Sequence, residues 1–311
     1  MKIVFMGTPE FARRPLEYLH TQSGLEIVAV VTGPDKPSGR GRKLKPTPVK
    51  KAALGLGLSV LTPNELKDNS LVERLKSFNA DIFVIVAFRI LPEMIFSIPP
   101  KGSINLHGSL LPKYRGAAPI QWAIINGETE TGLTTFFLKK KVDTGNIIYR
   151  ERIEIKPDET YDDLAERMSE MAGPVIEKTL DIIEKENFVP ELQDDILATP
   201  APKFTADDCI IDWNESAETI INRIRGLSSV PGAFTNFRNK KLKILRAKKS
   251  DESVSEGYSP GEIIPDKRSL FISSIDGVVE IIQVVPEGKS AISGDQFIRG
   301  YQPQPKEKAG E

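Results

Sequence analysis

The first half of the chain alternates short apolar runs with stretches of helical periodicity, and this alternation restricts the fold more than any other feature of the sequence. The helical stretches are residues 11–20 and 64–78, and Thr8 and Pro9 supply an N-cap and a first-turn proline for the first of them. Alternation of this kind predicts an α/β domain with a parallel sheet. The apolar runs are nearly continuous, as expected of strands buried on both faces, and cover residues 2–6, 26–31, 81–87 and 103–106.

A change of character near residue 190 predicts a second domain. A helix over residues 161–186, interrupted at Gly173 and Pro174, is followed by a proline-dotted stretch without periodicity. At 311 residues, the chain is also longer than one hydrophobic core usually serves. The pattern predicts three parts along the chain, namely a first domain over 1–189, a linker over 190–206 and a second domain over 207–311.

The second domain has the pattern of a small β-barrel. One amphipathic helix begins near Ser216, and only short strands and turns follow it. The clearest hairpin is centred on Asp276 and Gly277, a pair that suits the positive φ angles of a two-residue turn. The last stretch, residues 302–311, is rich in Gln, Pro and Lys and is predicted to be disordered.

Composition excludes several classes of function. The chain has 42 Lys and Arg residues against 43 Asp and Glu, so it is not a uniformly basic nucleic-acid binder and any basic surface has to be local. A single cysteine, Cys209, and two histidines provide neither a disulfide framework nor a zinc site, so no metal is expected. The N-terminus lacks the apolar stretch of a signal peptide, and no window is long enough to span a bilayer. A cytoplasmic protein without membrane contact is therefore expected.

The turn at Gly7, between the first apolar run and the first helix, does not carry a dinucleotide fingerprint. No glycine follows Gly7 until Gly24, so the close-approach glycines that let backbone amides hold a pyrophosphate are absent from the sequence. A phosphate-binding loop of the GxxxxGKS type is absent from it as well. Neither NAD nor ATP is expected as a cofactor.

A polar pair stands at the end of the fourth apolar run. Strand alternation puts Asn105 and His107 on the same face, at the carboxyl end of a parallel strand, where open α/β sheets bind their ligands. An amide can donate to developing negative charge and an imidazole can move a proton near neutral pH, a combination that suits acyl transfer. Asp143 follows the run over 131–138 and could orient the imidazole. Structural roles stay open for all three: a capping asparagine, a histidine satisfied by backbone and an Asx-turn aspartate.

These three residues, together with the runs SLLPKYRGAAPIQWAI (109–124), ETG (130–132) and DTG (143–145), resemble the folate-dependent formyltransferases. The resemblance covers nearly the whole chain, with the motifs in the same order. It implies a Rossmann-like formyltransferase domain and a C-terminal domain of OB-fold type. It also implies 10-formyltetrahydrofolate as the formyl donor and, as acceptor, the α-amino group of methionyl initiator tRNA, formylated for translation initiation.

The same resemblance implies a role for each site residue. Asn105 would hold the formyl oxygen. His107 would protonate the departing folate nitrogen or stabilise the intermediate, and Asp143 would orient His107 and relay the proton of the amine. One departure stands at Phe88-Arg89, where many relatives carry Tyr-Gly. The residues expected to line the folate pocket are Ser109, Leu110, Leu111, Pro112, Phe88 and Leu91.

Two basic segments either contact tRNA phosphates or form ordinary solvated surface. Residues 36–51 carry seven Lys or Arg and no acidic residue in a loop rich in Gly and Pro, and residues 239–249 carry six basic residues between apolar ones. The residues expected to contact tRNA, and so to make the second domain a tRNA-binding one, are Arg40, Arg42, Lys43, Lys241 and Lys243.

Two other interpretations remain at this stage. A formyltransferase that acts on a small amine would share Asn105, His107 and Asp143 but would have no use for the basic loop and the β domain. A catalytically silent RNA-binding relative would keep the fold without the reaction. Because no apolar stripe stands out as an interface, a monomer is expected.

Overall fold

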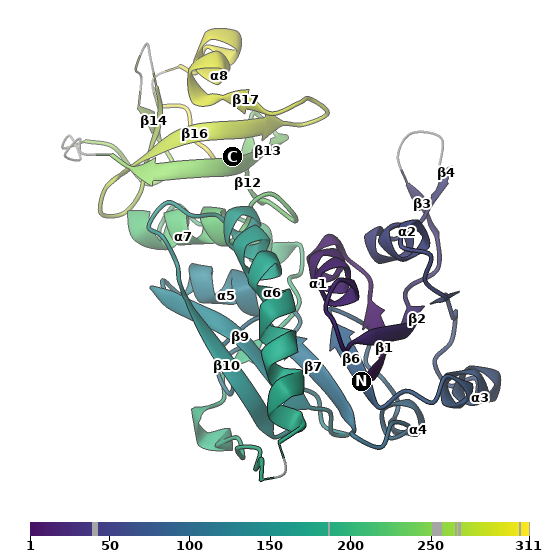
Figure 1. Ribbon diagram of the computed structural model, residues 1–311. Coiled ribbons are helices and arrows are strands. Elements are labelled where there is room, and N and C mark those ends of the chain that lie inside the picture. Colours follow the sequence, from purple (N-terminus) through teal and green to yellow (C-terminus); the bar gives the residue numbers. More distant parts are fainter. Residues whose placement is uncertain are drawn as a thin grey trace. The chain divides into compact units, whose positions relative to one another are not determined.

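The computed structural model describes residues 1–38, 43–185, 187–250, 257–264, 266, 269–304 and 306–310. Contacts along the chain divide it into two compact units (Figure 1). The boundaries predicted at residues 189 and 207 stay predictions, because contacts group segments without showing which part folds independently. The first unit comprises Met1–Gly116, Thr131–Ile153 and Ala165–Pro200; the second comprises Ala117–Glu130, Glu154–Leu164 and Ala201–Glu311.

The first unit is built on a sheet whose strand order, within the described residues, is β10-β9-β7-β6-β1-β2-β5. β1 pairs in parallel with both β2 and β6, and β6 pairs in parallel with β7, whereas β9 runs antiparallel to β7. The four apolar runs of the sequence form β1, β2, β6 and β7, so the predicted parallel α/β sheet is confirmed. The strands are β1 (Lys2–Gly7), β2 (Glu26–Val31), β5 (Val60–Leu61), β6 (Ile82–Val86), β7 (Ser103–His107), β9 (Glu130–Phe137) and β10 (Ile147–Glu154).

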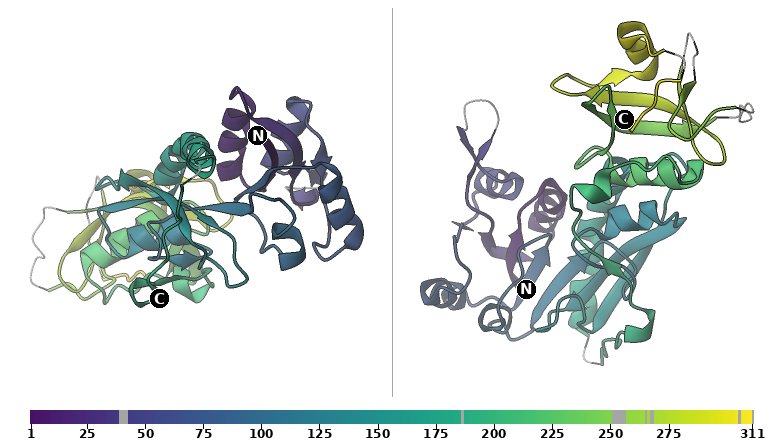
Figure 2. Two further views of the ribbon diagram at one scale, coloured as in Figure 1. Left: turned by 60° about the horizontal axis from the view of Figure 1, so that its bottom comes forward. Right: turned by 180° about the vertical axis from the view of Figure 1, so that it is seen from behind.

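Helices lie on both faces of the parallel part of this sheet, as Figure 2 shows around the purple N-terminal strands. Val4 and Met6 share a buried cluster with Leu75 of α3 and Ile95 of α4. The alternate side chains of β1 point to the other face, toward α1. The helices are α1 (Glu10–His20), α2 (Pro48–Gly55), α3 (Asn69–Ser77), α4 (Glu93–Phe96) and α6 (Tyr161–Ile183). Two short strands, β3 (Lys36–Ser38) and β4 (Lys43–Lys45), pair with each other.

Three local predictions in this unit are wrong. Thr8 does not cap α1, because Pro9 occupies the N-cap position without a side-chain hydrogen bond. The helix predicted over 64–78 begins only at Asn69, where the Asp68 side chain accepts a hydrogen bond from the Ser70 N–H. α6 is continuous through residues 173 and 174.

The glycine of α6 serves packing. A Cβ at Gly173 would lie 2.5 Å from the Tyr18 ring, so the absence of a side chain lets α1 approach α6 closely. The Tyr18 hydroxyl also donates to Glu177, one turn further along α6, at 2.7 Å. The Gly-Pro pair in the sequence therefore marks a helix contact, not a helix end.

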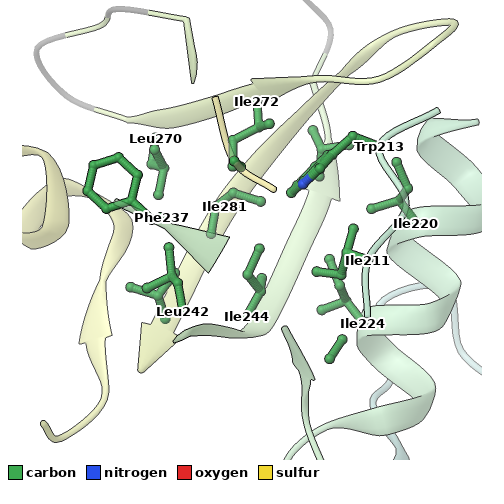
Figure 3. Packing of buried hydrophobic residues seen from close by; sticks show 14 of the residues in the cluster. Ile211, Trp213, Ile220, Ile224, Phe237, Leu242, Ile244, Leu270, Ile272 and Ile281 are labelled. Atoms are coloured by element: carbon green, nitrogen blue, oxygen red, sulfur yellow. The ribbon is translucent and has the colours of Figure 1, made fainter. Parts of the chain in front are cut away.

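The second unit is a curled antiparallel sheet with helices, and its core is shown in Figure 3. Within the described residues the strand order is β12-β13-β16-β15-β14, with β17 also paired to β16. Ile220 and Ile224 of α7 meet Ile244 and Ile281 of the sheet in one buried cluster, so the predicted small β domain is confirmed as a half-barrel closed by helices. The elements are β12 (Ala233–Phe237), β13 (Lys240–Lys249), β14 (Ile263–Ile264), β15 (Leu270–Ser273), β16 (Val278–Pro286), β17 (Ile292–Ser293), α5 (Pro119–Ile125), α7 (Ala217–Leu227) and α8 (Gly294–Tyr301).

The predicted helix and hairpin of the second unit are present, but two details differ. Ser216 caps α7 by accepting from the Thr219 N–H, as its position suggests. The hairpin loop, however, spans residues 274–277 and not two residues, and the Asp276 carboxylate accepts from the Ala217 N–H at the start of α7. Asp276 therefore anchors a helix instead of forming a tight turn.

The C-terminal stretch predicted to be disordered is packed over its described residues. Ala309 belongs to the buried cluster, the Ile263 N–H donates to the Glu307 carbonyl, and Glu307 forms an ion pair with Arg238. The prediction failed because it weighed the polar composition of the tail and not the backbone groups that the sheet offers it. Among the helices of the described residues, none combines the length and apolar character needed to cross a bilayer.

A buried arginine secures α7 in the second unit. Arg225 is only 7 % exposed, and its guanidinium donates to the carbonyls of Lys156, Pro157 and Glu159 and to the Asn222 side chain. Burial lowers the pKa of Arg225, the expected cost of placing a charge among apolar groups. The Lys156 carbonyl also accepts from the Glu159 N–H, whereas removal of the guanidinium would take a donor from all three carbonyls at once. Arg225 is therefore expected to stabilise the second unit.

We predict that Arg225→Met lowers the free energy of unfolding by about 3 kcal/mol, because buried carbonyls lose their donors. Arg246→Met is the matched control, since its ion pair with Asp163 is half exposed on both sides and is expected to contribute about 0–1 kcal/mol. Denaturant unfolding followed by circular dichroism measures both variants. Equal stabilities would show that the Arg225 contacts do not hold the unit together.

Candidate active site

The candidate site lies in the first unit, at the edge of the sheet where its parallel strands end. β6 ends at Val86 and β7 at His107, and the two strands run side by side with Val86 opposite Leu106. The segments that follow them, residues 87–92 and 108–118, therefore emerge at the same edge; the second includes the short strand β8 (Arg115–Gly116), which pairs with β11 (Pro200–Ala201). This is the edge at which open α/β sheets bind ligands. The predicted position of His107, at the carboxyl end of a parallel strand, is confirmed, whereas its role in a reaction stays a prediction.

Asn105 and His107 occupy the same face of β7. They stand opposite Phe136 and Thr134 of β9, two positions apart on each strand, so the alternation expected from the sequence holds. Asn105 is half-buried, and within the described residues its side-chain amide has no hydrogen-bond partner. A half-buried amide left free in this way is available to donate to a bound ligand.

The imidazole of His107 is buried, with 5 % of the residue exposed, and both ring nitrogens have defined surroundings. Nε2 lies 2.8 Å from the carbonyl oxygen of Tyr114. A carbonyl can only accept, so Nε2 carries the proton in the neutral ring and Nδ1 keeps its lone pair. The free nitrogen, Nδ1, points toward Asp143, whose Oδ2 is 3.9 Å away.

Asp143 reaches the histidine from the connection between β9 and β10. Its carboxylate is 12 % exposed, and Oδ2 accepts a hydrogen bond of 3.0 Å from the Gly116 N–H. The sequence left open an Asx turn, but the carboxylate is bonded 27 residues away from its own position. At 3.9 Å, Asp143 is too distant for a direct hydrogen bond to His107, yet close enough to stabilise an imidazolium.

Two residues that contact His107 have positive φ angles, a backbone conformation that most residues with a Cβ avoid. Tyr114 has φ +60° and Asp143 has φ +53°, both in the left-handed region that costs energy for a residue with a Cβ. The two residues supply the carbonyl and the carboxylate that face the two ring nitrogens of His107. Strain located at these two positions is typical of a functional site.

The glycines of the ETG and DTG motifs are required by close backbone packing. A Cβ at Gly145 would lie 1.5 Å from the Phe137 carbonyl oxygen, and a Cβ at Gly132 would lie 2.2 Å from the Glu151 carbonyl oxygen. Neither contact is sterically possible. Gly145 therefore lets the Asp143 loop fold back against the end of β9, which is how Asp143 comes to face His107.

The loop after β7 holds the residues predicted to line a folate pocket. Ser109 is fully buried, and its hydroxyl donates to the Lys113 carbonyl, which assigns this side chain to shaping the loop. Leu111 is also buried and packs with Phe136 and Ile147. Leu110 and Pro112 are half-buried, so they expose part of their surface beside the site.

The loop after β6 supplies the other two residues of that predicted wall. Leu91 is 8 % exposed and belongs to the core cluster of the first unit, and Phe88 packs against the same cluster from its edge. Arg89, where the sequence departs from the family pattern, donates to the carbonyls of Pro63 and Asn64 at 2.8 and 2.9 Å and stacks over Phe88. Arg89 thus fixes the loop, and the folate roles of Phe88 and Leu91 stay predictions.

The predicted tRNA contacts are described only in part. Arg40 and Arg42 lie outside the described residues, and Lys43 begins β4. Lys241 and Lys243 lie on β13 on the face opposite the buried Leu242 and Ile244, as strand alternation predicts. The Lys241 ammonium sits 3.4 Å above the centroid of the Phe234 ring, and the Lys243 ammonium donates to the Pro231 carbonyl at 2.7 Å.

Sequence reasoning missed two backbone groups that organise the site. The Tyr114 carbonyl fixes the tautomer of His107, and the Gly116 N–H holds the Asp143 carboxylate. Both belong to the PKYRG stretch, whose mixture of Pro, Lys, Arg and Gly gave no signal beyond a loop. Main-chain groups act without regard to side-chain type, so no residue pattern announces them.

Other features of the described residues do not compete with this site. No group of three or more His, Cys, Asp or Glu there could hold a metal ion. A hollow of about 680 Å³ lies near Met1, Glu26 and Asp81, at the starts of β1, β2 and β6. It is therefore at the opposite edge of the sheet from His107.

The arrangement suits the transfer of an acyl group. A free amide on the Asn105 side chain can donate to an oxygen that gains negative charge, and Nδ1 of His107 can take up or deliver a proton. Asp143 stabilises the imidazolium that forms when Nδ1 is protonated. Neither a nucleophilic side chain nor a metal is required by this geometry.

Comparisons with known proteins point to the same chemistry. Residues 1–180 match the family model described as formyl transferase, and residues 203–302 match its C-terminal domain. The chain is 42 % identical over 307 residues to a methionyl-tRNA formyltransferase of Chlorobium luteolum, with 98 % of each chain covered.

Two solved structures share the fold at lower identity. A methionyl-tRNA formyltransferase from Clostridium thermocellum has a TM-score of 0.58 and 19 % identity, and the match covers 81 % of this chain and 94 % of that one. An N-formyltransferase from Helicobacter canadensis, solved with folinic acid and dTDP-3-aminofucose, has a TM-score of 0.69 and 22 % identity, with 92 % and 100 % covered.

We predict that neutral His107 carries its proton on Nε2, because the Tyr114 carbonyl can only accept. Long-range ¹H–¹⁵N correlation spectra distinguish the two ring nitrogens, and His20→Gln removes the only other histidine signal. At a pH where the ring is neutral, the expected spectrum has a protonated Nε2 and an unprotonated Nδ1. A protonated Nδ1 would contradict the arrangement.

Proposed function

This chain belongs to the formyl transferase family, and we propose that it transfers the formyl group of 10-formyltetrahydrofolate to the α-amino group of methionyl initiator tRNA. The observation that carries the proposal is the convergence of Asn105, His107 and Asp143 in a chain similar to methionyl-tRNA formyltransferases over nearly its full length. The product is formylmethionyl-tRNA, used in translation initiation.

The residues at the site fit a formyl donor. Within the part of the chain that the structure describes, no group binds the Asn105 amide, which faces the same side of β7 as His107, so a formyl oxygen can be held beside the imidazole. Leu110 and Pro112 offer apolar surface at the same edge of the sheet, which suits the ring system of a folate. The segment proposed to contact folate is Ser109, Leu110, Leu111 and Pro112, with Phe88 and Leu91 from the neighbouring loop.

In the proposed reaction, a carbon–nitrogen bond to the methionyl amine forms as the bond between the formyl carbon and the folate nitrogen breaks. Asn105 donates to the formyl oxygen while negative charge develops on it. His107 delivers a proton from Nδ1 to the departing nitrogen, and the attacking amine gives up a proton in return. Asp143 stabilises the imidazolium and accepts the amine's proton through water, so proton number is conserved.

A formyltransferase acting on a small amine is the second candidate. The N-formyltransferase from Helicobacter canadensis was solved with an amino-sugar nucleotide and shares the fold over 92 % of this chain, so fold alone does not distinguish the two substrates. The near-full-length identity to methionyl-tRNA formyltransferases favours the tRNA substrate. A catalytically silent relative would have no use for a free amide and a strained carboxylate at one edge of the sheet.

The two basic segments are the proposed tRNA contacts. Arg40 and Arg42 lie outside the described residues, Lys43 is the first residue of β4, and Lys241 and Lys243 stand on the outer face of β13. Ammonium and guanidinium groups bind phosphates by releasing counterions, which allows a chain of net charge −1 to bind RNA locally. We further propose that the protein acts as a monomer in the cytoplasm, where charged tRNA enters translation.

We predict that Asn105→Ala lowers turnover about 10²–10³-fold, because an oxyanion donor is lost. For His107→Ala and Asp143→Asn the expected loss is about 10²–10⁴-fold, with tRNA binding retained. The assay supplies labelled 10-formyltetrahydrofolate with methionyl initiator tRNA, free methionine or small amines.

His20→Gln is the matched control, because the exposed His20 at the end of α1 is the other histidine of the chain and should leave turnover unchanged. Folded Asn105→Ala and His107→Ala proteins with wild-type turnover would exclude the proposed chemistry. Labelling of a small amine in preference to charged tRNA would instead support the second candidate.

We predict that tRNA affinity falls steeply as salt rises, and that Arg40→Ala, Arg42→Ala and Lys241→Ala each reduce the slope of log Kd against log salt by about 1. Lys76→Ala removes one positive charge from α3, outside both basic segments, and should leave the slope unchanged. Filter binding between low and physiological salt measures the slopes. An affinity indifferent to salt would exclude both segments as phosphate contacts.

A further inference from the structure

We propose that Gln193, held in place by Arg115, is a positioning residue that sets the Asp143 carboxylate for proton transfer; this inference rests on the proposed function of the same site. Gln193 lies in the proline-dotted stretch that the sequence identifies only as a linker. Neither its position nor its residue type marked it as part of the site.

The side-chain amide of Gln193 holds the Asp143 loop at two points. Nε2 donates to the carbonyl oxygen of Asp143 at 3.0 Å and to that of Gly145 at 2.7 Å. Two carbonyls of one loop, separated by the residue Thr144, thus accept hydrogen bonds from one NH₂ group. The left-handed conformation of Asp143, with φ +53°, is the conformation that this pair of bonds holds.

The other end of the amide is fixed by Arg115. The guanidinium donates to Oε1 of Gln193 from Nε at 3.0 Å and from Nη2 at 2.7 Å, and its Nη1 forms an ion pair of 2.7 Å with Asp195. The Arg115 side chain is only 13 % exposed, so this anchor is largely shielded from water. Both heavy atoms at the end of the Gln193 amide are therefore engaged, and the amide has one orientation.

Arg115 also connects this anchor to the second group that holds Asp143. Gly116, the next residue, donates its N–H to Asp143 Oδ2, and the Arg115 N–H donates to the Thr199 carbonyl at 2.8 Å. Gly116 thus binds the side chain of Asp143, and Gln193 binds its backbone. Gly116 and Arg115, which fixes Gln193, belong to the same short segment after β7. This segment also carries the Tyr114 carbonyl that contacts His107.

Only an amide satisfies all of these contacts. The position needs a group that donates twice, to Asp143 and Gly145, and accepts from a guanidinium. Glutamate has the same shape and would bind Arg115 more strongly, but it would place a carboxylate oxygen against two carbonyl oxygens. The Gln193→Glu substitution therefore keeps the Arg115 anchor and removes only the hold on the Asp143 loop.

The test compares Gln193→Glu with the wild type in formyl transfer to methionyl initiator tRNA. The expected result is a loss of about 10–10²-fold in kcat with KM for folate and tRNA unchanged, because a displaced catalytic group slows the chemical step without weakening binding. In an Asp143→Asn background the same substitution should cause no further loss, since Gln193 acts through Asp143. A purely structural role would give losses that multiply.

A spectroscopic measurement gives the same answer without activity. In the His20→Gln background, Gln193→Glu should shift the ring ¹H and ¹⁵N resonances of His107 in the long-range correlation spectrum, because the neighbouring carboxylate moves. Leu192→Glu is the matched control: Leu192 is 73 % exposed, and the substitution adds the same charge one residue away. It should leave both turnover and the His107 resonances unchanged.

Three outcomes overturn the inference: wild-type kcat in Gln193→Glu, an equal further loss in the Asp143→Asn background, or an equal effect of Leu192→Glu. Failure of the proposed function looks different. In that case the wild type itself does not formylate charged tRNA, and the same comparison is then made with whichever amine it formylates.

Discussion

The hydrogen bond between His107 Nε2 and the Tyr114 carbonyl is the contact on which the rest of the site depends. It assigns the ring proton, and so it decides which nitrogen is free for chemistry and which way that nitrogen points. Because the carbonyl comes from the loop directly after β7, the tautomer is fixed within seven residues of the histidine. A carboxylate can then influence the reactive nitrogen only from the Nδ1 side of the ring. Asp143 lies on that side, with its Oδ2 3.9 Å from Nδ1.

The position of Asp143 beside His107 requires backbone conformations that are energetically unfavourable for most residues. The connection between β9 and β10 has to turn back against β9 closely enough that residue 145 has no room for a Cβ, and it has to hold Asp143 in the left-handed region. Such conformations persist only where neighbouring groups over-determine them. Here the neighbours are the Gly116 N–H on the carboxylate and the Gln193 amide on the carbonyls of Asp143 and Gly145. The geometry of the proposed active site therefore depends on three chain segments together.

The fold was predictable from sequence to a greater extent than the site. Buried strands leave continuous apolar runs, so β1, β2, β6 and β7 were identified, and alternation along β7 correctly paired Asn105 with His107. Sequence patterns failed where a residue contacts a partner distant in the chain: Gly173 leaves room for Tyr18, and Asp276 accepts from the Ala217 N–H at the start of α7. The groups that hold His107 and Asp143 in place could not be predicted from the sequence for the same reason. A main-chain carbonyl has no sequence signature, and Gln193 sits in a stretch whose prolines indicate only irregular structure.

The energetic character of the site argues for catalysis over a fold kept only for binding. A carboxylate 12 % exposed beside an imidazole and two non-glycine residues at positive φ are both costly features of the sheet edge on which they lie. A surface that only binds RNA phosphates gains nothing from any of them, because phosphates are bound by exposed cations. These costs coincide at one point of the sheet, the point at which we propose that formyl transfer takes place. Formyl transfer needs a donor to the oxygen, a proton for the departing nitrogen and an acceptor for the proton of the amine at a single place, so the coincidence supports the proposed reaction.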